Sequence, residues 1–130
     1  MTATRLGSGA PWEAVVGYSR VVATADAAWV SGTTATVDGV VVHPGDAAAQ
    51  TRVALETVAR ALSDAGFSLD DVVRTRIYVT DISAWEQVGR AHGEVFGEIR
   101  PATTMVQVAA LIDPAMLVEI EADAVRGAGA

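Results

Sequence analysis

Hydrophobic and polar residues alternate along the last quarter of the chain, from Arg100 to Val125. A period of two residues is typical of a strand with one buried face. In the final run, one predicted face carries Met116, Val118, Ile120, Ala122 and Ala124, and the other carries Leu117, Glu119, Glu121, Asp123 and Val125. We expect two extended runs that are partner strands, joined by a turn at Asp113-Pro114. The row of three carboxylates is either plain solvent exposure or part of a site.

Two other stretches repeat their apolar residues at helical spacing. The first predicted helix covers residues 46–65, with Asp46 as a good N-cap and Gly66 as a good C-cap. Its apolar stripe is formed by Leu55, Val58, Ala59 and Leu62. The second predicted helix covers residues 84–97, with Ser83 and Glu86 spaced as a capping box. Its stripe is formed by Trp85, Val88, His92, Val95 and Phe96.

The remaining residues read as strands and turns. Residues 1–11 predict an extended arm or an edge strand, and residues 12–34 predict a hairpin in which Gly32 marks a bulge. Asp38-Gly39 is a tight-turn pair, and residues 72–80 alternate as a further strand. We therefore expect a single domain over residues 1–130 of the α+β class, with both helices on one face of a mixed or antiparallel sheet.

Charge and composition narrow the classes of function. The formal net charge is −7, Lys is absent and all nine basic residues are Arg. No basic stripe is available for a nucleic-acid backbone, so we expect no nucleic-acid partner. Cysteine is absent, which excludes disulfides and thiol catalysis. The two isolated His residues do not have metal-ligand spacing, so we expect no metal.

Hydrophobic residues make up 51% of the chain, but no run approaches the ~18 uncharged residues of a membrane span. The N-terminal residues lack the apolar core of a signal peptide. We therefore expect a cytoplasmic protein with no membrane partner. The surplus of apolar residues is expected to face other copies of the same chain.

Seven short motifs are spread over nearly the whole chain: Gly17-Tyr18-Ser19, Ser31-Gly32, Ala49-Gln50-Thr51-Arg52, Asp71-Val72-Val73, Tyr78-Val79-Thr80-Asp81, Arg100-Pro101-Ala102 and Val118-Glu119-Ile120-Glu121-Ala122. No single motif is specific, but in order and spacing together they resemble the Rid family (reactive intermediate deaminases, also called the YjgF family). The resemblance implies a chorismate-mutase-like fold, with about six strands in a mixed sheet and two helices on one face. It also implies a homotrimer with a central barrel and three clefts between subunits.

Typical members of that family hydrolyse imines and enamines to a keto acid and ammonia, without a metal or organic cofactor. By resemblance, Glu119 is the catalytic residue that handles the attacking water, and Tyr18, Ser31 and Gly32 line the cleft. The family's carboxylate-binding Arg directly follows the Pro-Ala pair, where this chain has Thr103. Losing that clamp should weaken carboxylate binding by roughly ten- to thousand-fold. The chain therefore resembles the branch of the family that lacks the signature Arg.

Several neighbouring residues can each be interpreted in two ways. Thr103 and Thr104 are either plain strand residues or cleft hydroxyls that bind substrate. Arg100 is either a loop residue or a replacement anion clamp, and Arg20 and Arg90 are weaker candidates for that clamp. Gly89 stands where the family usually has an Asn that lines the cleft.

The other polar residues near the acidic row have structural interpretations. We expect Glu121 and Asp123 to be structural, with Arg74 and Arg76 available to neutralise them. We expect His92 to be a partly buried core or interface residue, because it lies on the apolar stripe of the second helix.

Three functions stay open from the sequence. The first is a small-molecule hydrolase that deaminates an imine or enamine, with a substrate range altered by Thr103. The second is a non-catalytic trimer that binds a metabolite or a protein. The third is an endoribonuclease or translation inhibitor, a function often attached to this family, which the acidic balance and the absence of Lys disfavour.

Overall fold

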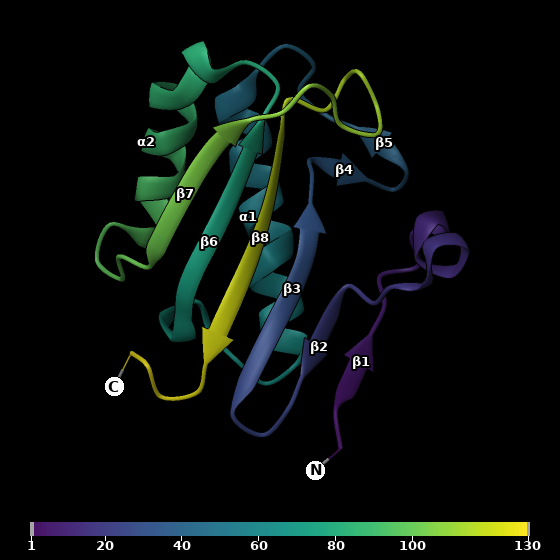
Figure 1. Ribbon diagram of the computed structural model, residues 1–130, viewed down its shortest axis with the longest axis vertical. Helices are drawn as coiled ribbons and strands as arrows, with labels where there is room; N and C mark the ends of the chain where they lie inside the picture. Colours follow the sequence, from purple (N-terminus) through teal and green to yellow (C-terminus); the bar gives the residue numbers. More distant parts are fainter. Residues whose placement is uncertain (1, 130) are drawn as a thin grey trace.

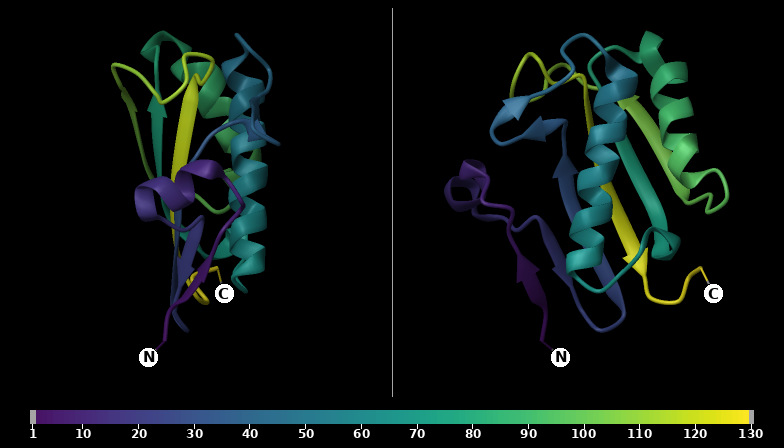
Figure 2. Two further views of the ribbon diagram at one scale, coloured as in Figure 1. Left: turned by 90° about the vertical axis from the view of Figure 1, so that its right-hand side faces the viewer. Right: turned by 180° about the vertical axis from the view of Figure 1, so that it is seen from behind.

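A mixed six-stranded sheet forms the centre of the protein, and two helices cover one of its faces (Figure 1). This arrangement comes from a computed structural model that describes residues 2–129. In spatial order, the strands are β1 (Thr4–Leu6), β2 (Val21–Ala23), β3 (Ala27–Thr33), β8 (Val118–Val125), β6 (Val72–Val79) and β7 (Ala102–Gln107). The helices are α1 (Ala47–Asp64) and α2 (Trp85–Phe96). The side view shows both helices on the same side of the sheet, as the sequence predicts, which leaves the other face open (Figure 2).

The C-terminal strand β8 lies in the middle of the sheet, antiparallel to β3 on one side and to β6 on the other. The predicted alternation is confirmed, since Val118, Ile120, Ala122 and Ala124 are buried on the helix side. Burial of Val118 or Ile120 contributes about 1.5–3 kcal/mol relative to the exposed side chain, and the smaller Ala side chains contribute less. The open face of β8 carries the three carboxylates.

The expected pairing of the last two strands is wrong. Strand β6 lies between β7 and β8, and β7 pairs with β6 in parallel. A parallel pair requires a crossover connection, which α2 supplies between β6 and β7. The chain then returns from β7 across β6 to reach the centre of the sheet. Sequence alternation identifies strands, but it does not say which strands are neighbours.

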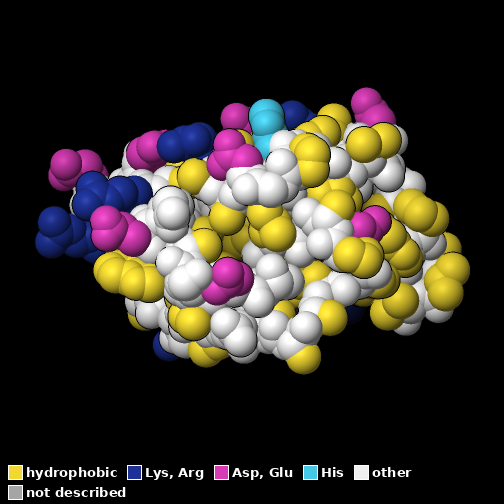
Figure 3. Space-filling model, turned by 90° about the horizontal axis from the view of Figure 1, so that it is seen from above, with side chains coloured by type: hydrophobic (Ala, Val, Ile, Leu, Met, Phe, Trp, Pro, Cys, Tyr) yellow, Lys and Arg dark blue, Asp and Glu magenta, His cyan; other side chains and the backbone are white. Residues whose placement is uncertain are grey.

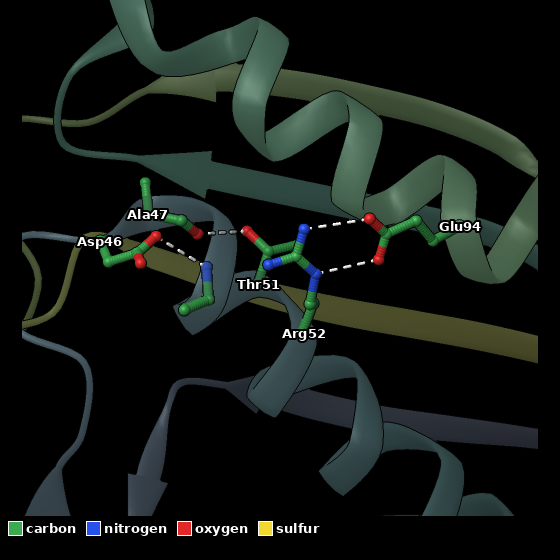
Figure 4. Close-up of polar contacts among 6 residues, drawn as sticks. Asp46, Ala47, Thr51, Arg52 and Glu94 are labelled. Carbon is green, nitrogen blue, oxygen red and sulfur yellow. Dashed lines mark hydrogen bonds and ion pairs between the residues drawn. The ribbon is translucent and has the colours of Figure 1, made fainter.

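Helix α1 has both of its predicted caps. The Asp46 side chain accepts a hydrogen bond from the Ala49 backbone N–H at 3.0 Å (Figure 4). At the other end, Gly66 has a φ of +83°, and Phe67 N–H donates to Leu62 O at 2.8 Å. A left-handed residue after the last turn is the usual reason for glycine at that position. Figure 4 also shows Arg52 of α1 bound through two hydrogen bonds to Glu94 of α2, at 2.9 and 3.0 Å.

Helix α2 begins differently from its prediction. The Ser83 hydroxyl donates to Asp81 Oδ1 at 2.7 Å, and the Ser83 backbone N–H donates to the same oxygen at 2.9 Å. Asp81 therefore caps a short 3₁₀ turn, Ile82–Ala84, that precedes the helix. Glu86 accepts a hydrogen bond from Arg90 one turn later instead of closing a capping box.

The hairpin predicted over residues 12–34 is about half correct. Strands β2 and β3 form a hairpin, and the register shift between Val30 and Thr33 confirms the bulge expected at Gly32. Residues Glu13–Gly17, however, form a short helical turn, η1, instead of a strand. Val15 and Val16 on this turn are 85% and 69% exposed. Valine favours strands only where a partner strand and a buried face are available, and this segment has neither.

The segments before and after this hairpin agree with their predictions. Strand β1 pairs with β2 at the edge of the sheet, which agrees with an edge strand within residues 1–11. The Asp38-Gly39 turn joins β4 (Thr36–Val37) to β5 (Val40–Val41), with φ angles of 51° and 79° at the two turn residues. Two central residues with positive φ are typical of the tight hairpin turn predicted for this pair. Among residues 2–129, no helix is long and apolar enough to cross a membrane.

Candidate functional site

Two of the three carboxylates on the open face of β8 are paired with neighbouring side chains. Arg76 on β6 lies 3.4 Å from Glu121 and 3.3 Å from Asp123, measured between the charged atoms. The Tyr78 hydroxyl donates to Glu121 at 3.0 Å. Burial and then this hydrogen bond raise the pKa of Tyr78. Glu121 and Asp123 therefore belong to a structural cluster, as expected from the sequence.

Glu119 differs from the other two carboxylates. None of the ion pairs within residues 2–129 includes it. Its carboxyl group lies against Gly32 of β3, so closely that a Cβ at position 32 would overlap Glu119 Oε2. Burial raises the pKa of Glu119, the charge of Arg20 opposes that rise, and the charge of Glu121 adds to it. A partly buried carboxyl group with a raised pKa is a common feature of acid–base sites.

Arg20 lies beside this carboxyl group, just before β2. Its Nη1 atom donates to Ser31 O at 3.2 Å, to Gly32 O at 2.8 Å and to Thr33 Oγ1 at 2.7 Å. The guanidinium carbon also lies 5.7 Å from the centre of the Tyr18 ring. The arginine is thus held at the bulge of β3, between Tyr18 and Glu119.

A hollow of about 480 Å³ lies between η1 and strands β1 to β3, and it shares Tyr18 and Ser31 with the surroundings of Arg20. Tyr18 and Ser31 line it together with Glu13. The Ser31 hydroxyl donates to Ser19 O at 2.6 Å, so its oxygen remains available as an acceptor for a ligand. Gly17 has a φ of +87°, which allows the chain to turn sharply from η1 into Tyr18.

Thr103 lies on β7 and faces the helices. Its hydroxyl is 2.8 Å from the Thr75 hydroxyl on β6, which is 2.9 Å from Nε2 of His92 on α2. Thr75 is buried, and burial lowers the pKa of His92, which favours the neutral form of the imidazole. The structure agrees with the expected core position of His92, whose ring also contacts the Phe96 ring.

This chain of hydroxyl groups has a preferred direction. The Thr103 hydroxyl donates its single proton to Pro101 O at 3.2 Å. Thr75 must then donate to Thr103, and His92 must donate from Nε2 to Thr75. In this arrangement Thr103 offers only its remaining acceptor lone pair at the edge of the sheet, because its single proton is used on Pro101 O.

The residues predicted to form one site fall into two groups that do not meet within one chain. Tyr18, Ser31, Gly32 and Glu119 lie together around β3 and β8, whereas Thr103, Thr104 and Arg100 lie on or before β7. Strand β6 separates the two groups, since Glu119 is opposite Tyr78, and Tyr78 is opposite Val106. At about 3.3 Å per residue and 4.8 Å per strand, the Cα atoms of Thr103 and Glu119 are roughly 14 Å apart. Their side chains also leave opposite faces of the sheet.

Arg100 and Thr104 also lie away from Glu119. Arg100 is in the loop that precedes β7, where its Nε donates to Gly97 O at 3.0 Å and it borders a second hollow of about 450 Å³. Thr104 is opposite Arg76 on the open face and is exposed. Among residues 2–129, no three His, Asp or Glu side chains come together in a way that could hold a metal ion.

Sequence reasoning named Arg20 only as a weaker candidate for the anion clamp, and it missed Thr75. Arg20 directly follows the Gly17-Tyr18-Ser19 motif, and its position opposite Ser31 in the hairpin could have indicated that it reaches the Ser31-Gly32 motif. Thr75 left no signal, because a threonine in the middle of a strand is ordinary and its link to Thr103 depends on the parallel pairing of β6 and β7.

Comparisons with known proteins agree on one family. A family model described as "Endoribonuclease L-PSP" matches residues 8–126. Rv2704 from Mycobacterium tuberculosis, a member of the YjgF/YER057c/UK114 family, is 53% identical to this chain in sequence. Its crystal structure matches this fold with a TM-score of 0.87. That match covers 95% of this chain and 99% of Rv2704.

Two relatives known by sequence extend the comparison. The uncharacterized protein SCO2049 of Streptomyces coelicolor is 40% identical over 124 residues, which are 95% of this chain and 92% of the relative. The 3-aminoacrylate deaminase RutC of Acinetobacter baylyi is 48% identical over 80 residues, which are 62% of this chain and 63% of RutC. One relative is thus similar over nearly its whole length, and the relative with a named activity is similar over part of it.

Proposed function

The chain belongs to the YjgF or Rid family, and from that premise we propose that it hydrolyses a small imine or enamine, with Glu119 as the acid–base group. The similarity to a protein named 3-aminoacrylate deaminase supports this class of reaction. An enamine first gains a proton at carbon and loses one from nitrogen, which makes it an imine. Water then adds to the imine carbon and ammonia leaves, so one group must accept a proton from water and a proton must reach the nitrogen.

The position of Glu119 is the observation that supports this proposal most directly. Its carboxyl group has no ion-pair partner within residues 2–129 and lies against Gly32, the residue after Ser31, which lines the hollow with Tyr18. Burial raises its pKa, which brings the group closer to the range in which it can both take up and release a proton. As a carboxylate it would accept the proton of the attacking water, and as an acid it would return it to the leaving nitrogen.

We also propose that a complete site forms only between copies of the chain. Residues near β3 and residues on β7 cannot meet within one copy, whereas a second copy could bring its β7 edge to the hollow. Several large hydrophobic side chains are exposed, including Val15, Val16, Trp29, Trp85 and Ile112. Seen from above, hydrophobic side chains dominate one end of the molecule, while most of the visible Arg side chains gather at the other (Figure 3). An apolar surface of this kind favours self-association, and a closed homotrimer would bury it between subunits.

The test is ammonia release from 3-aminoacrylate and from imines of small amino acids, generated in the assay. Wild-type protein should accelerate the release from at least one of them, and Glu119→Gln should reduce that rate by about 10²–10⁴-fold. The matched control is Glu56→Gln, which removes the same charge from an exposed position on α1 and should keep the wild-type rate. Wild-type rates equal to the uncatalysed rate for all of these substrates would rule out deaminase chemistry.

A non-catalytic binding role is the second candidate, and Thr103 is the observation that favours it. The Thr103 hydroxyl is tied to Thr75 and Pro101 and carries no charge. The β7 edge therefore lacks an ionic anchor for a substrate at this position. A ligand that raises the melting temperature in a saturable way, without turnover, would support this role.

The name of the family model also suggests RNA cleavage as a function. The net charge of −7 and the absence of Lys argue against binding an RNA backbone. RNA cleavage that persists through purification and is lost in Glu119→Gln would overturn that argument.

A further inference from the structure

Three arginines are candidates to replace the missing anion clamp, and the structure separates them. Arg90 is exposed on α2, where it is paired with Glu86. Arg100 lies before β7, and its side chain bonds to the backbone of the preceding turn. Arg20 alone among the three lies beside Glu119, at the bulge where Gly32 meets that carboxyl group.

The guanidinium group of Arg20 is fixed on one side and free on the other. Its Nη1 atom holds three acceptors on β3, whereas Nε and Nη2 make no hydrogen bond within residues 2–129. In the same described part of the chain, no fully buried side-chain nitrogen or oxygen lacks a partner. The Nε and Nη2 atoms are therefore reached by solvent.

This free edge has the geometry that a carboxylate needs. Nε–H and one Nη2–H of an arginine point in the same direction and can donate in parallel to the two oxygens of one carboxylate. Because Nη1 already anchors the group, little additional side-chain ordering is required when a ligand binds. The Tyr18 ring, 5.7 Å from the guanidinium carbon, borders the group on one side.

We propose that the Nε–Nη2 edge of Arg20 binds the carboxylate of a small substrate, so that the imine or enamine carbon lies near Glu119. This assignment rests on the proposed function and names its substrate class: short, planar 2- or 3-carbon acids that carry the reactive nitrogen. It moves the anion-binding role from the β7 edge to the β2–β3 hairpin, on the same chain as Glu119.

The charges around Arg20 allow such a ligand. None of the ion pairs within residues 2–129 includes Arg20. Glu13 and Glu119 are close enough for the arginine charge to act on their carboxyl groups, but neither is bound to it. An incoming carboxylate therefore displaces no existing partner, and the burial that favours the protonated form of Glu119 reduces repulsion between the two groups.

The first test compares a carboxylate substrate with its uncharged methyl ester. For 3-aminoacrylate, Arg20→Gln should raise KM by about ten- to thousand-fold, because a bidentate charged contact is lost. For methyl 3-aminoacrylate, the same variant should change KM by less than about threefold, because the ester makes no such contact. Arg20→Lys should fall between wild type and Arg20→Gln with the acid, since lysine keeps the charge but not the fork. Arg60→Gln, an exposed arginine on α1, is the control for a loss of surface charge.

The second test uses wild-type protein, so it does not depend on whether an Arg20 variant folds. Pyruvate should shift the NMR resonance of the Arg20 Nε–H group in a saturable way, and methyl pyruvate should not. Through-bond NMR correlations from the backbone of residue 20 assign that resonance in the wild-type protein.

The two proposals fail in different ways. If 3-aminoacrylate is hydrolysed but its KM and that of the ester respond equally to Arg20→Gln, the assignment to Arg20 is wrong and the hydrolase proposal stands. If no imine or enamine is hydrolysed but pyruvate shifts the Arg20 resonance, the carboxylate site stands and the hydrolase proposal is wrong. No shift with pyruvate overturns the assignment.

Discussion

At the scale of single residues, Gly32 and Glu119 depend on each other. A side chain at position 32 would overlap the end of Glu119, which is a flexible side chain and can swing away at little cost. We therefore expect Gly32→Ala to displace the carboxyl group while it changes the free energy of unfolding by less than about 1 kcal/mol. Hydrolysis should fall by at least about tenfold, because a misplaced catalytic group is ineffective. Enzyme assays and urea denaturation of the same sample measure both effects.

Gly93→Ala is the matched control for this variant. Gly93 lies on α2, and a Cβ there would contact nothing within 4 Å. Activity should be unchanged, and helix propensity predicts a stabilisation of up to about 1 kcal/mol. Equal activities of Gly32→Ala and wild type would show that the position of Glu119 against Gly32 has no catalytic importance.

Glu119 should also affect how the free energy of unfolding depends on pH. Burial raises the pKa of Glu119 in the folded state above its ordinary value of about 4.3. The folded state then binds more protons than the unfolded state, so this group's contribution to stability is present at low pH and is lost as pH rises through the folded pKa. Glu119→Gln does not titrate, so its stability relative to wild type should increase between pH 4 and pH 7. Urea denaturation at both pH values measures this, and a constant difference would contradict it.

At the scale of elements, three side chains join β6, β7 and α2. Thr75 connects the Thr103 hydroxyl to the His92 ring from a buried position. Thr75→Val keeps the shape of the side chain but leaves the buried Nε2 of His92 without its partner. The expected loss is about 1–3 kcal/mol of unfolding free energy. Thr104→Val, at an exposed neighbour on β7, should stay within about 0.5 kcal/mol of wild type.

Chemical denaturation of the two variants measures this difference, and NMR can detect its cause. Wild-type His92 should carry its proton on Nε2, because that N–H donates to Thr75. A neutral His92 ring protonated on Nδ1 would contradict the direction of the chain of hydroxyl groups.

Element prediction from sequence succeeded where local chemistry dominates and failed where neighbours decide. The cap at Asp46, the stop at Gly66 and the alternation of β8 depend on residues close in sequence, and all three are confirmed. The valines near Gly17 suggested a strand, but no neighbouring strand pairs with them, and they form η1. At α2, Asp81 competed successfully for the Ser83 hydroxyl that a capping box would have used.

At the scale of the whole molecule, the division of the site into two groups makes a strong prediction about mixed assemblies. If each cleft takes Glu119 from one copy and Thr103 from the next, two different defective variants can complement each other. Glu119→Gln and Thr103→Trp should each have low activity alone. Randomly mixed one to one, about a quarter of the clefts combine an intact residue from each copy and should recover activity. Co-expression followed by enzyme assay measures this recovery.

The control mixes Glu119→Gln with Gly32→Ala. Gly32 and Glu119 meet within one chain, so every cleft keeps one defect and no activity should return. Light scattering should show an oligomer in each sample. A monomer with full activity would contradict the proposed cleft between copies.

The sequence by itself determined the family resemblance, the α+β class, both helices and the buried face of β8, because these follow from local periodicity, capping and motif order. It also identified Glu119 and Gly32 as candidate site residues, but not as neighbours. Only the tertiary structure decided that β6 separates β7 from β8, which divides the expected site. It also decided that Arg20 lies beside Glu119, since that contact depends on hairpin register and on a bulge. Strand order and register arise from contacts between distant residues, and alternation along one strand carries no record of them.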